Sequence, residues 1–240
     1  MAYLEGTNLV AAYGVVPILH ECSVKVEKGE LAVIVGPNGA GKSTVMRVLL
    51  GMLEATSGSV TLDGNDISML STQERISLGL AFVPQNKNVF PSMTVEENLE
   101  MGAFLRTDDI KKTMEEVYSL FPILYEKRRQ LAEELSGGQR QQVAFGRAMM
   151  TQPSVMLLDE PTAGVDVNLR QQLWKYIIKL NKMGTTIILT THYIEEAEKL
   201  CDRISIIDKG KLIIAEKKTK IMNKFKKKNL EDIFLKLTKT

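Results

Sequence analysis

Residues 36–44 read GPNGAGKST, which fits the phosphate-binding loop pattern of Gly, four residues, Gly, Lys and Ser or Thr. The apolar run LAVIV at 31–35 predicts a buried strand before the loop, and residues 43–50 predict a helix that Gly51 ends. Glycines let backbone N–H groups converge on phosphate oxygens, and the helix N-terminus adds roughly half a positive charge. A glycine-rich turn with a solvated lysine would explain neither flank. We therefore expect a phosphate site here.

The loop side chains indicate how a nucleotide would be held. Lys42 would reach the outer phosphates, and the Ser43 hydroxyl would be a ligand of Mg²⁺. The candidate nucleotide-binding residues of the loop are Gly36, Asn38, Gly39, Ala40, Gly41, Lys42, Ser43 and Thr44.

Length and composition are those of a soluble globular protein. The 240 residues, 44% hydrophobic and 25% charged, allow one domain with an inserted subdomain. No apolar run approaches the roughly 20 residues that span a bilayer, and no signal peptide opens the chain. We therefore expect a cytosolic protein or one bound peripherally to a membrane partner. Cys22 and Cys201 lack metal-ligand spacing and are expected in the core.

The net charge of +2 is unevenly distributed along the chain. From Lys209 onward, eleven lysines and three acidic residues give a net +8, which leaves −6 for the rest. Contact with nucleic acid or acidic lipid is one interpretation. A solvated lysine face is favoured, because Phe225 is the only aromatic residue interleaved with the lysine run at 217–228.

Hydrophobic patterning predicts strand-bearing halves around a helical block. Alternation within residues 3–30 predicts antiparallel strands ahead of the loop. From about residue 94 to 151 the pattern is helical, and strands return at 154–158, 185–191, 203–207 and 211–215. The sequence pairs Ser71 with Glu74 and Thr94 with Glu97 predict capping boxes. Such a block between strands predicts an inserted helical subdomain.

A phosphate loop alone is compatible with kinases, GTPases, motors and ATPases, but a second acidic site narrows the choice. The run VMLLD at 155–159 predicts a strand that delivers Asp159 to the Mg²⁺ shell opposite Ser43. Glu160, immediately after, can polarise a water for in-line attack on the γ-phosphate. An exposed acid pair at a strand end is the alternative, disfavoured by the phosphate loop upstream.

The stretch LSGGQ at 135–139 predicts a second anion site. Ser136 would cap a helix, Gly137 and Gly138 permit close backbone approach, and free N–H groups would face outward. One chain has no second phosphate to place there. With the two preceding motifs, this stretch makes the chain resemble the ATP-binding-cassette (ABC) ATPases from about residue 4 to 215. In that family two subunits meet head to tail, with ATP sandwiched between the phosphate loop of one and the signature stretch of the other.

The resemblance implies roles for further residues. Tyr13, which spacing alone leaves as either a purine-stacking or a packing residue, matches the aromatic that stacks on adenine. Gln85 matches the glutamine that senses Mg²⁺ and water and couples to the membrane partner. The residues that match the signature are Ser136, Gly137, Gly138 and Gln139. Asp166 matches the aspartate that crosses the dimer interface, and His192 matches the histidine that contacts the γ-phosphate.

The resemblance also implies a fold. We expect an α/β protein with a P-loop NTPase core on a mixed sheet, an N-terminal antiparallel β subdomain and an inserted helical subdomain. The expected single domain 1–240 divides into a nucleotide-binding core (1–86 and 152–215), a helical subdomain (87–151) and a basic tail (216–240). Leu230, Ile233, Phe234 and Leu237 recur at helical spacing and predict an amphipathic helix in that tail.

The two halves resemble different subfamilies. VPQ at 83–85, VFP at 89–91, TVEENL at 94–99, LFP at 120–122 and GRAM at 146–149 are similar to the ATPase of branched-chain amino-acid importers. The sequence THY at 191–193 departs from that ATPase, which usually carries Glu-Gln-Asn there. With LEDIFL at 230–235 it resembles ATPases of drug- and polysaccharide-type (ABC-2) exporters. Import and export both stay open.

The expected function is an ATPase subunit that powers a membrane transporter, with ATP and Mg²⁺ as cofactors. Its expected partners are integral membrane permease subunits and a second ATPase subunit, identical or paralogous, and no nucleic acid. It would lie peripherally on the cytoplasmic face of the cell membrane. A soluble ABC protein acting on RNA or DNA is the alternative, but such proteins usually carry two cassettes or a long coiled-coil insertion. An unrelated phosphate-loop kinase or GTPase would have no use for the signature stretch.

Overall fold

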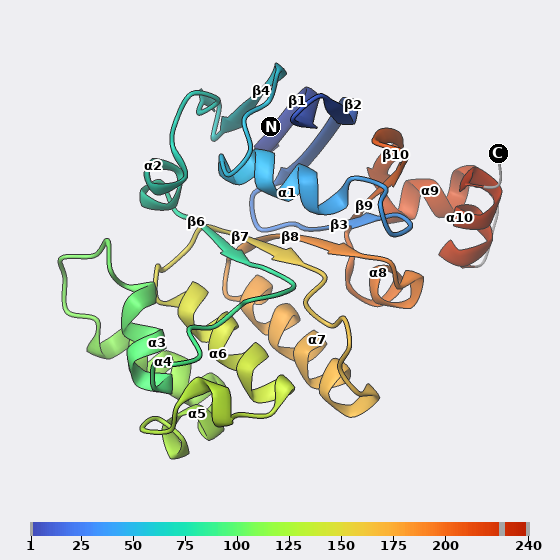
Figure 1. Ribbon diagram of the computed structural model, residues 1–240. Helices are drawn as coiled ribbons and strands as arrows, with labels where there is room; N and C mark the ends of the chain where they lie inside the picture. The colour runs from blue at the N-terminus through green and yellow to red at the C-terminus, as the bar shows by residue number, and fades with distance from the viewer. Residues whose placement is uncertain (1, 226–228, 239–240) are drawn as a thin grey trace.

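A computed structural model describes residues 2–225 and 229–238 and shows two β-sheets with helices between and below them (Figure 1). The larger sheet has the strand order β10-β9-β3-β8-β7-β6. Neighbouring strands are parallel except β10, which is antiparallel to β9, so the sheet is mixed as expected. Its strands are β3 (Leu31–Val35), β6 (Leu80–Val83), β7 (Val155–Asp159), β8 (Thr186–Thr191), β9 (Arg203–Asp208) and β10 (Lys211–Lys217).

The three central strands of this sheet are buried over their full length. Every residue of β3, β7 and β8 is buried, because helices or the second sheet cover both faces. This explains why these strands are continuous apolar or β-branched runs without polar alternation. The strand order β3-β8-β7 also places the carboxyl ends of these strands side by side. The phosphate loop follows the end of β3, and Asp159 and Glu160 lie at the end of β7.

The smaller sheet is antiparallel, with the order β2-β1-β4-β5, and confirms the predicted N-terminal strands. Helix α1 (Lys42–Leu50) lies between the two sheets (Figure 1). One hydrophobic core joins them, with residues such as Leu4, Leu49 and Leu157 fully buried in it. The strands of this sheet are β1 (Ala2–Tyr13), β2 (Val16–Glu27), β4 (Ser57–Leu62) and β5 (Asn65–Asp66).

Helices cover the opposite face of the larger sheet and form the block that the sequence predicted between residues 94 and 151. All the predicted capping boxes are present, at Ser71 and Thr94, and Ser136 begins α6 with a third. The helices beyond α1 are α2 (Thr72–Ser77), α3 (Val95–Gly102), α4 (Lys111–Leu120), α5 (Pro122–Glu126), the 3-10 turn η1 (Ala132–Glu134), α6 (Gly137–Met149), α7 (Val167–Lys182), α8 (Ile194–Leu200), α9 (Lys218–Phe225) and α10 (Leu230–Thr238).

The helical block is tightly packed at a glycine. A Cβ on Gly146 would lie 2.7 Å from a Leu99 methyl and 2.8 Å from a Val117 methyl, so α6 can approach α3 and α4 only without a side chain there. This packing belongs to the second hydrophobic core, which runs from β3 through α6 and α7 to α8. The division of the chain into subdomains stays a prediction.

The basic tail contains the predicted amphipathic helix, α10. Leu230 and Ile233 are buried, and α10 packs near α8 (Figure 1). The lysines at 226–228 and 239 lie outside the described residues. Both cysteines are buried, as predicted, and burial raises the pKa of each thiol to about 12. In residues 2–225 and 229–238, no helix combines the length and apolarity needed to cross a bilayer.

Candidate functional site

The phosphate loop brings Lys42 to the ends of the central strands. A Cβ on Gly36 would lie 2.2 Å from the Ile207 carbonyl oxygen, so only glycine fits where the loop leaves β3. Gly41, with φ of 101°, turns the chain into α1. Lys42 is only 4% exposed, and its Nζ donates to the Gly36 carbonyl at 2.9 Å and the Pro37 carbonyl at 3.1 Å. The ammonium group therefore points back over the loop, where phosphate oxygens would lie.

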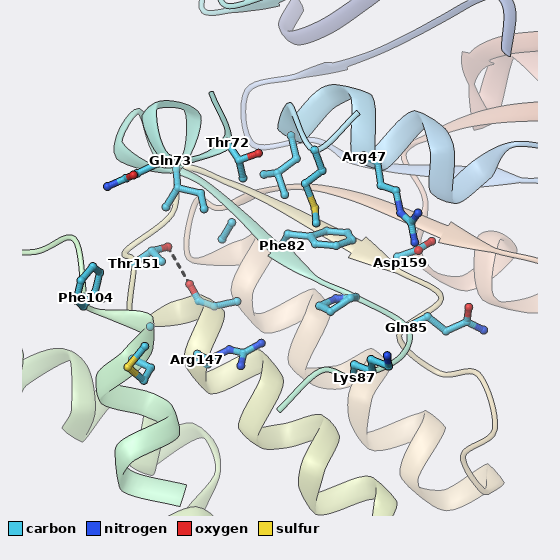
Figure 2. Close-up of a pocket in the computed structure, with 18 of the residues that line it drawn as sticks. Arg47, Thr72, Gln73, Phe82, Gln85, Lys87, Phe104, Arg147, Thr151 and Asp159 are labelled. Atoms are coloured by element: carbon cyan, nitrogen blue, oxygen red, sulfur yellow. Dashed lines mark hydrogen bonds between the residues drawn. The ribbon is translucent and has the colours of Figure 1, made fainter. Parts of the chain in front are cut away.

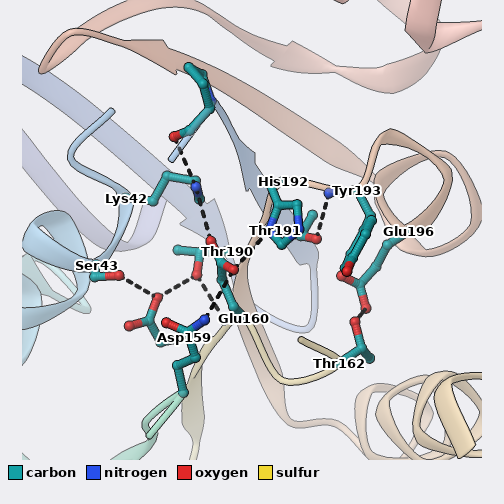
Figure 3. A network of polar contacts seen from close by, with 12 residues as sticks. Lys42, Ser43, Asp159, Glu160, Thr162, Thr190, Thr191, His192, Tyr193 and Glu196 are labelled. Atoms are coloured by element: carbon teal, nitrogen blue, oxygen red, sulfur yellow. Dashed lines mark hydrogen bonds and ion pairs between the residues drawn. The ribbon is translucent and has the colours of Figure 1, made fainter. Parts of the chain in front are cut away.

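Asp159 and Ser43 meet at the end of β7, although 116 residues separate them. The Ser43 hydroxyl donates to Asp159 Oδ1 at 2.9 Å, and the Thr190 hydroxyl of β8 donates to the same oxygen at 2.6 Å (Figure 3). The strand order β3-β8-β7 causes this meeting, because carboxyl ends of parallel strands gather at one edge of a sheet.

Glu160 is the centre of the polar network in Figure 3. Its carboxylate lies 3.0 Å from Lys42 Nζ and 2.8 Å from His192 Nδ1, and it accepts a long 3.4 Å hydrogen bond from Gln85 Nε2. Glu160 is 8% exposed and has a φ of 45°. Its N–H donates to the Thr190 carbonyl and hydroxyl at 3.1 and 3.0 Å. This left-handed conformation costs energy in a non-glycine residue, and Thr190 compensates for part of it.

A cavity of about 480 Å³ opens in front of this network. Tyr13 stands at its rim, 44% exposed, and the Tyr13 hydroxyl accepts a 2.9 Å hydrogen bond from Arg47 Nη1. Exposure argues against the packing alternative for Tyr13, and Arg47 holds the ring in place. The other residues that line the cavity are Ile18, Asn38, Gly39, Gly41, Lys42, Ser43, Thr44, Gln85, Glu160 and His192.

The signature stretch and Asp166 are placed elsewhere, and none of them lines this cavity. Ser136 caps α6, and the Asp166 carboxylate caps α7 by accepting from the Leu169 N–H at 2.9 Å. A Cβ on Gly138 would lie 2.1 Å from a Leu169 methyl, so the starts of α6 and α7 touch. The Gln139 N–H donates to Ser136 Oγ at 3.3 Å, which is the helix cap predicted at Ser136.

Comparison with known proteins settles the family. The family model described as ABC transporter matches residues 19–163. This chain belongs to the ABC transporter ATPases. The ABC ATPase is 39% identical over 203 residues to the high-affinity branched-chain amino acid transport ATP-binding protein BraG of Pseudomonas aeruginosa, covering 84% of this chain and 87% of BraG.

An exporter protein is similar as well. The lipopolysaccharide export system ATP-binding protein LptB of Haemophilus influenzae is 33% identical over 227 residues, covering 93% of this chain and 94% of LptB. Among solved structures, the dimeric post-hydrolysis state of the ATP-binding cassette MJ0796 bound to ADP and Pi has a TM-score of 0.80 and 28% identity, covering 89% of this chain and 98% of that one. The ABC ATPase thus has both import and export relatives.

The donor set of the ABC ATPase fits Mg²⁺ bound together with a nucleotide. In the described part of the chain no three His, Cys, Asp or Glu side chains form a metal cage. Mg²⁺ is typically held by one or two protein oxygens together with phosphates and water, rather than by such a cage. The adjacent Ser43 hydroxyl and Asp159 carboxylate supply oxygens of this kind.

Sequence motifs missed Thr190, which contacts both acidic residues of the site. It lies in a β-branched run that reads only as a strand. They also missed Arg47, which holds Tyr13, and Glu196, a buried carboxyl group discussed below. Spacing along the chain does not show which side chains meet across the fold, so these contacts required the tertiary structure.

Proposed function

We propose that this ATPase binds Mg²⁺-ATP in the 480 Å³ cavity and hydrolyses it with Glu160 acting on the attacking water. The observation that supports this most directly is that one buried carboxylate, Glu160, faces Lys42, Gln85 and His192 together. A general base needs a positioned carboxylate beside the phosphate to be attacked. The test is single-turnover hydrolysis by Glu160→Gln beside an ATP-binding titration of the same variant: loss of turnover with binding retained is expected.

The proposed roles of the other residues follow their positions. The backbone of residues 36–44 and Lys42 would hold the phosphates, and Tyr13 would stack on the adenine. Ser43, Asp159 and Gln85 would hold Mg²⁺, which when bound neutralises phosphate charge. His192 would contact the γ-phosphate while the nitrogen facing Glu160 keeps its ring oriented.

ATP would replace one interaction that the structure contains. Lys42 now pairs with Glu160 and two loop carbonyls, so its charge is satisfied within the protein. Phosphate oxygens would compete for the same ammonium group, and a Glu160 carboxylate relieved of Lys42 is then available to a water. Binding and preparation of the base are therefore coupled in this proposal.

A second subunit would complete the site. Ser136–Gln139 and Asp166 lie outside the cavity of their own chain. Ser136 and Asp166 are exposed and start adjacent helices, whose first N–H groups suit an anion. We therefore propose a head-to-tail dimer in which the Ser136 end of α6 from one subunit faces the phosphate loop of the other. The second subunit would be identical or a paralogue.

The membrane partner would bind at a second, larger cavity of about 850 Å³ (Figure 2). Met52, Met101 and Phe104 contribute exposed apolar surface to it, with Phe104 75% exposed. Gln85 lines both this cavity and the smaller one. A permease segment bound here, on the cytoplasmic face of the membrane, would thus contact Gln85, which donates a hydrogen bond to Glu160.

Branched-chain amino-acid import is the leading candidate for the transported substrate, supported by the similarity to BraG. Export, with an ABC-2 type transporter as the expected class, is the second candidate. His192 supports that exporter class, and the similarity to LptB supports export. Reconstitution with each candidate permease separates them: the true partner stimulates hydrolysis, and the other does not.

A further inference from the structure

Glu196 is a fully buried carboxyl group, 0% exposed, that no motif of the site explains. It lies on α8, close in sequence to His192 at the end of β8. Its Oε1 accepts a 2.9 Å hydrogen bond from the Thr162 hydroxyl (Figure 3). The same oxygen accepts a 2.7 Å hydrogen bond from Trp174 Nε1.

Both donors belong to the chain that follows Glu160. Thr162 is 1% exposed and lies in the segment 160–166, between Glu160 and the Asp166 cap of α7. Trp174 lies on α7 itself. One carboxyl oxygen of α8 therefore binds two parts of the chain after Glu160. These are the segment 160–166, through Thr162, and helix α7, through Trp174.

The surroundings of Glu196 are costly rather than stabilising. Its Oε2 has no hydrogen-bond partner among the described residues, and neither does Arg170 Nε. Burial raises the pKa of Glu196, opposed by the hydrogen bonds from Trp174 and Thr162 and by the charge of Arg170. The Arg170 guanidinium lies over the Tyr193 ring, 4.4 Å from its centroid. Burying a carboxyl group with one oxygen unpaired costs free energy of folding, so stability alone does not account for Glu196 at this position.

We propose that Glu196 is a positioning residue for ATP hydrolysis, which holds the segment 160–166 against the strand end that carries His192. The proposal rests on the proposed role of Glu160 in acting on water. The hydrogen bond from Thr162 is the one that affects Glu160, because Thr162 is two residues away from it in sequence. Trp174 donates to the same Glu196 oxygen from α7. Without the Thr162 contact, Glu160 would lose alignment with His192 while the phosphate loop stayed intact.

The matched pair Thr162→Val and Trp174→Phe tests this proposal, because each removes one donor to the same oxygen. For Thr162→Val we expect kcat to fall about 10- to 100-fold, the loss typical of a displaced reacting group, with KM for ATP within about twofold. For Trp174→Phe we expect thermal stability to fall while kcat stays within about threefold. A Thr162→Val variant with kcat within twofold of the parent overturns the proposal, as does an equal loss of kcat in both variants.

Substitutions at Glu196 supply the conservative rescue. Glu196→Gln keeps a carbonyl oxygen as acceptor, so kcat should stay within about threefold of the parent. Glu196→Ala should lose as much as Thr162→Val, and the double variant should lose no more than either alone. A glutamine variant as slow as the Thr162→Val variant contradicts hydrogen-bond positioning. If Glu196→Ala does not fold, the comparison of Glu196→Gln with Thr162→Val still decides.

Trp174 is the only tryptophan of the chain, so its fluorescence reports on the contact directly. In Thr162→Val the bond from Trp174 to Glu196 is retained, and the emission maximum should match the parent while kcat falls. A shifted maximum would show a general rearrangement of α7 and α8 and overturn the specific role of Thr162. Glu160→Gln is the separate control: if it hydrolyses ATP normally, the proposed base fails, whatever the Thr162 and Glu196 variants show.

Discussion

Lys42 and Glu160 form a buried ion pair, with 3.0 Å between Nζ and Oε1, across the space where the γ-phosphate would lie. Lys42 is the first residue of α1, which follows β3, and Glu160 directly follows β7. The pair can form because the carboxyl ends of β3 and β7 lie at the same edge of the sheet. In this arrangement the group that would bind phosphate and the group that would act on water restrain each other until ATP separates them.

Lys42→Ala should lower ATP affinity about 10- to 100-fold, because a charge-assisted hydrogen bond to the outer phosphates is lost. Isothermal titration with a non-hydrolysable ATP analogue measures it. Lys87→Ala is the control, since Lys87 lines the larger cavity and not the smaller one. An affinity for Lys42→Ala within twofold of the parent would remove Lys42 from the nucleotide site.

Glu160→Gln should lower turnover by about 10²–10⁴-fold and leave ATP binding intact, because the amide keeps the size of the side chain but not its basicity. Slow hydrolysis should also trap the ATP-bound dimer, which light scattering after size exclusion detects with ATP and not with ADP. Adding Ser136→Arg places a bulky cation at the start of α6 and should return the variant to monomer. A dimer that persists in this double variant contradicts the head-to-tail arrangement.

Gln85→Ala should lower permease-stimulated hydrolysis more than the basal hydrolysis of the isolated subunit. Gln85 lines both cavities, so its removal uncouples the two sites, and we expect a loss of stimulation of about fivefold or more. ATPase assays with and without the reconstituted permease give the comparison. Equal losses in the two assays would assign Gln85 to the chemical step alone.

Thr190→Val should reduce both stability and activity, because the Thr190 hydroxyl contacts Asp159 Oδ1 and the Glu160 N–H. Leaving those buried groups without this partner costs about 1–3 kcal/mol, measurable by urea denaturation. Thr186→Val is the matched control: Thr186 is equally buried on β8, and its hydroxyl accepts from the Gly29 N–H at 3.0 Å, away from the site. We expect the control to lose stability and keep kcat, whereas the same kcat in both variants would show that Thr190 has no part in the site.

Local patterns were sufficient for most elements of the fold. The capping boxes at Ser71 and Thr94, the strand before the phosphate loop and the amphipathic tail helix were all predicted correctly. Each depends on contacts within a few residues or on a single periodicity. Proline, glycine and capping side chains act on neighbouring backbone groups, so their effect is readable from spacing.

The sequence by itself determined the motifs and the family, because a phosphate loop, a strand-end acid pair and LSGGQ are each a short run of chain. Only the tertiary structure decided which motifs meet. The order β3-β8-β7 brings Ser43 to Asp159 and Lys42 to Glu160, and it leaves Ser136 outside the same site. Thr190 and Glu196 acquire their roles in the same way. Strand order and burial depend on how the whole core packs, and no local spacing encodes the partners that packing assigns to a buried hydroxyl or carboxyl group.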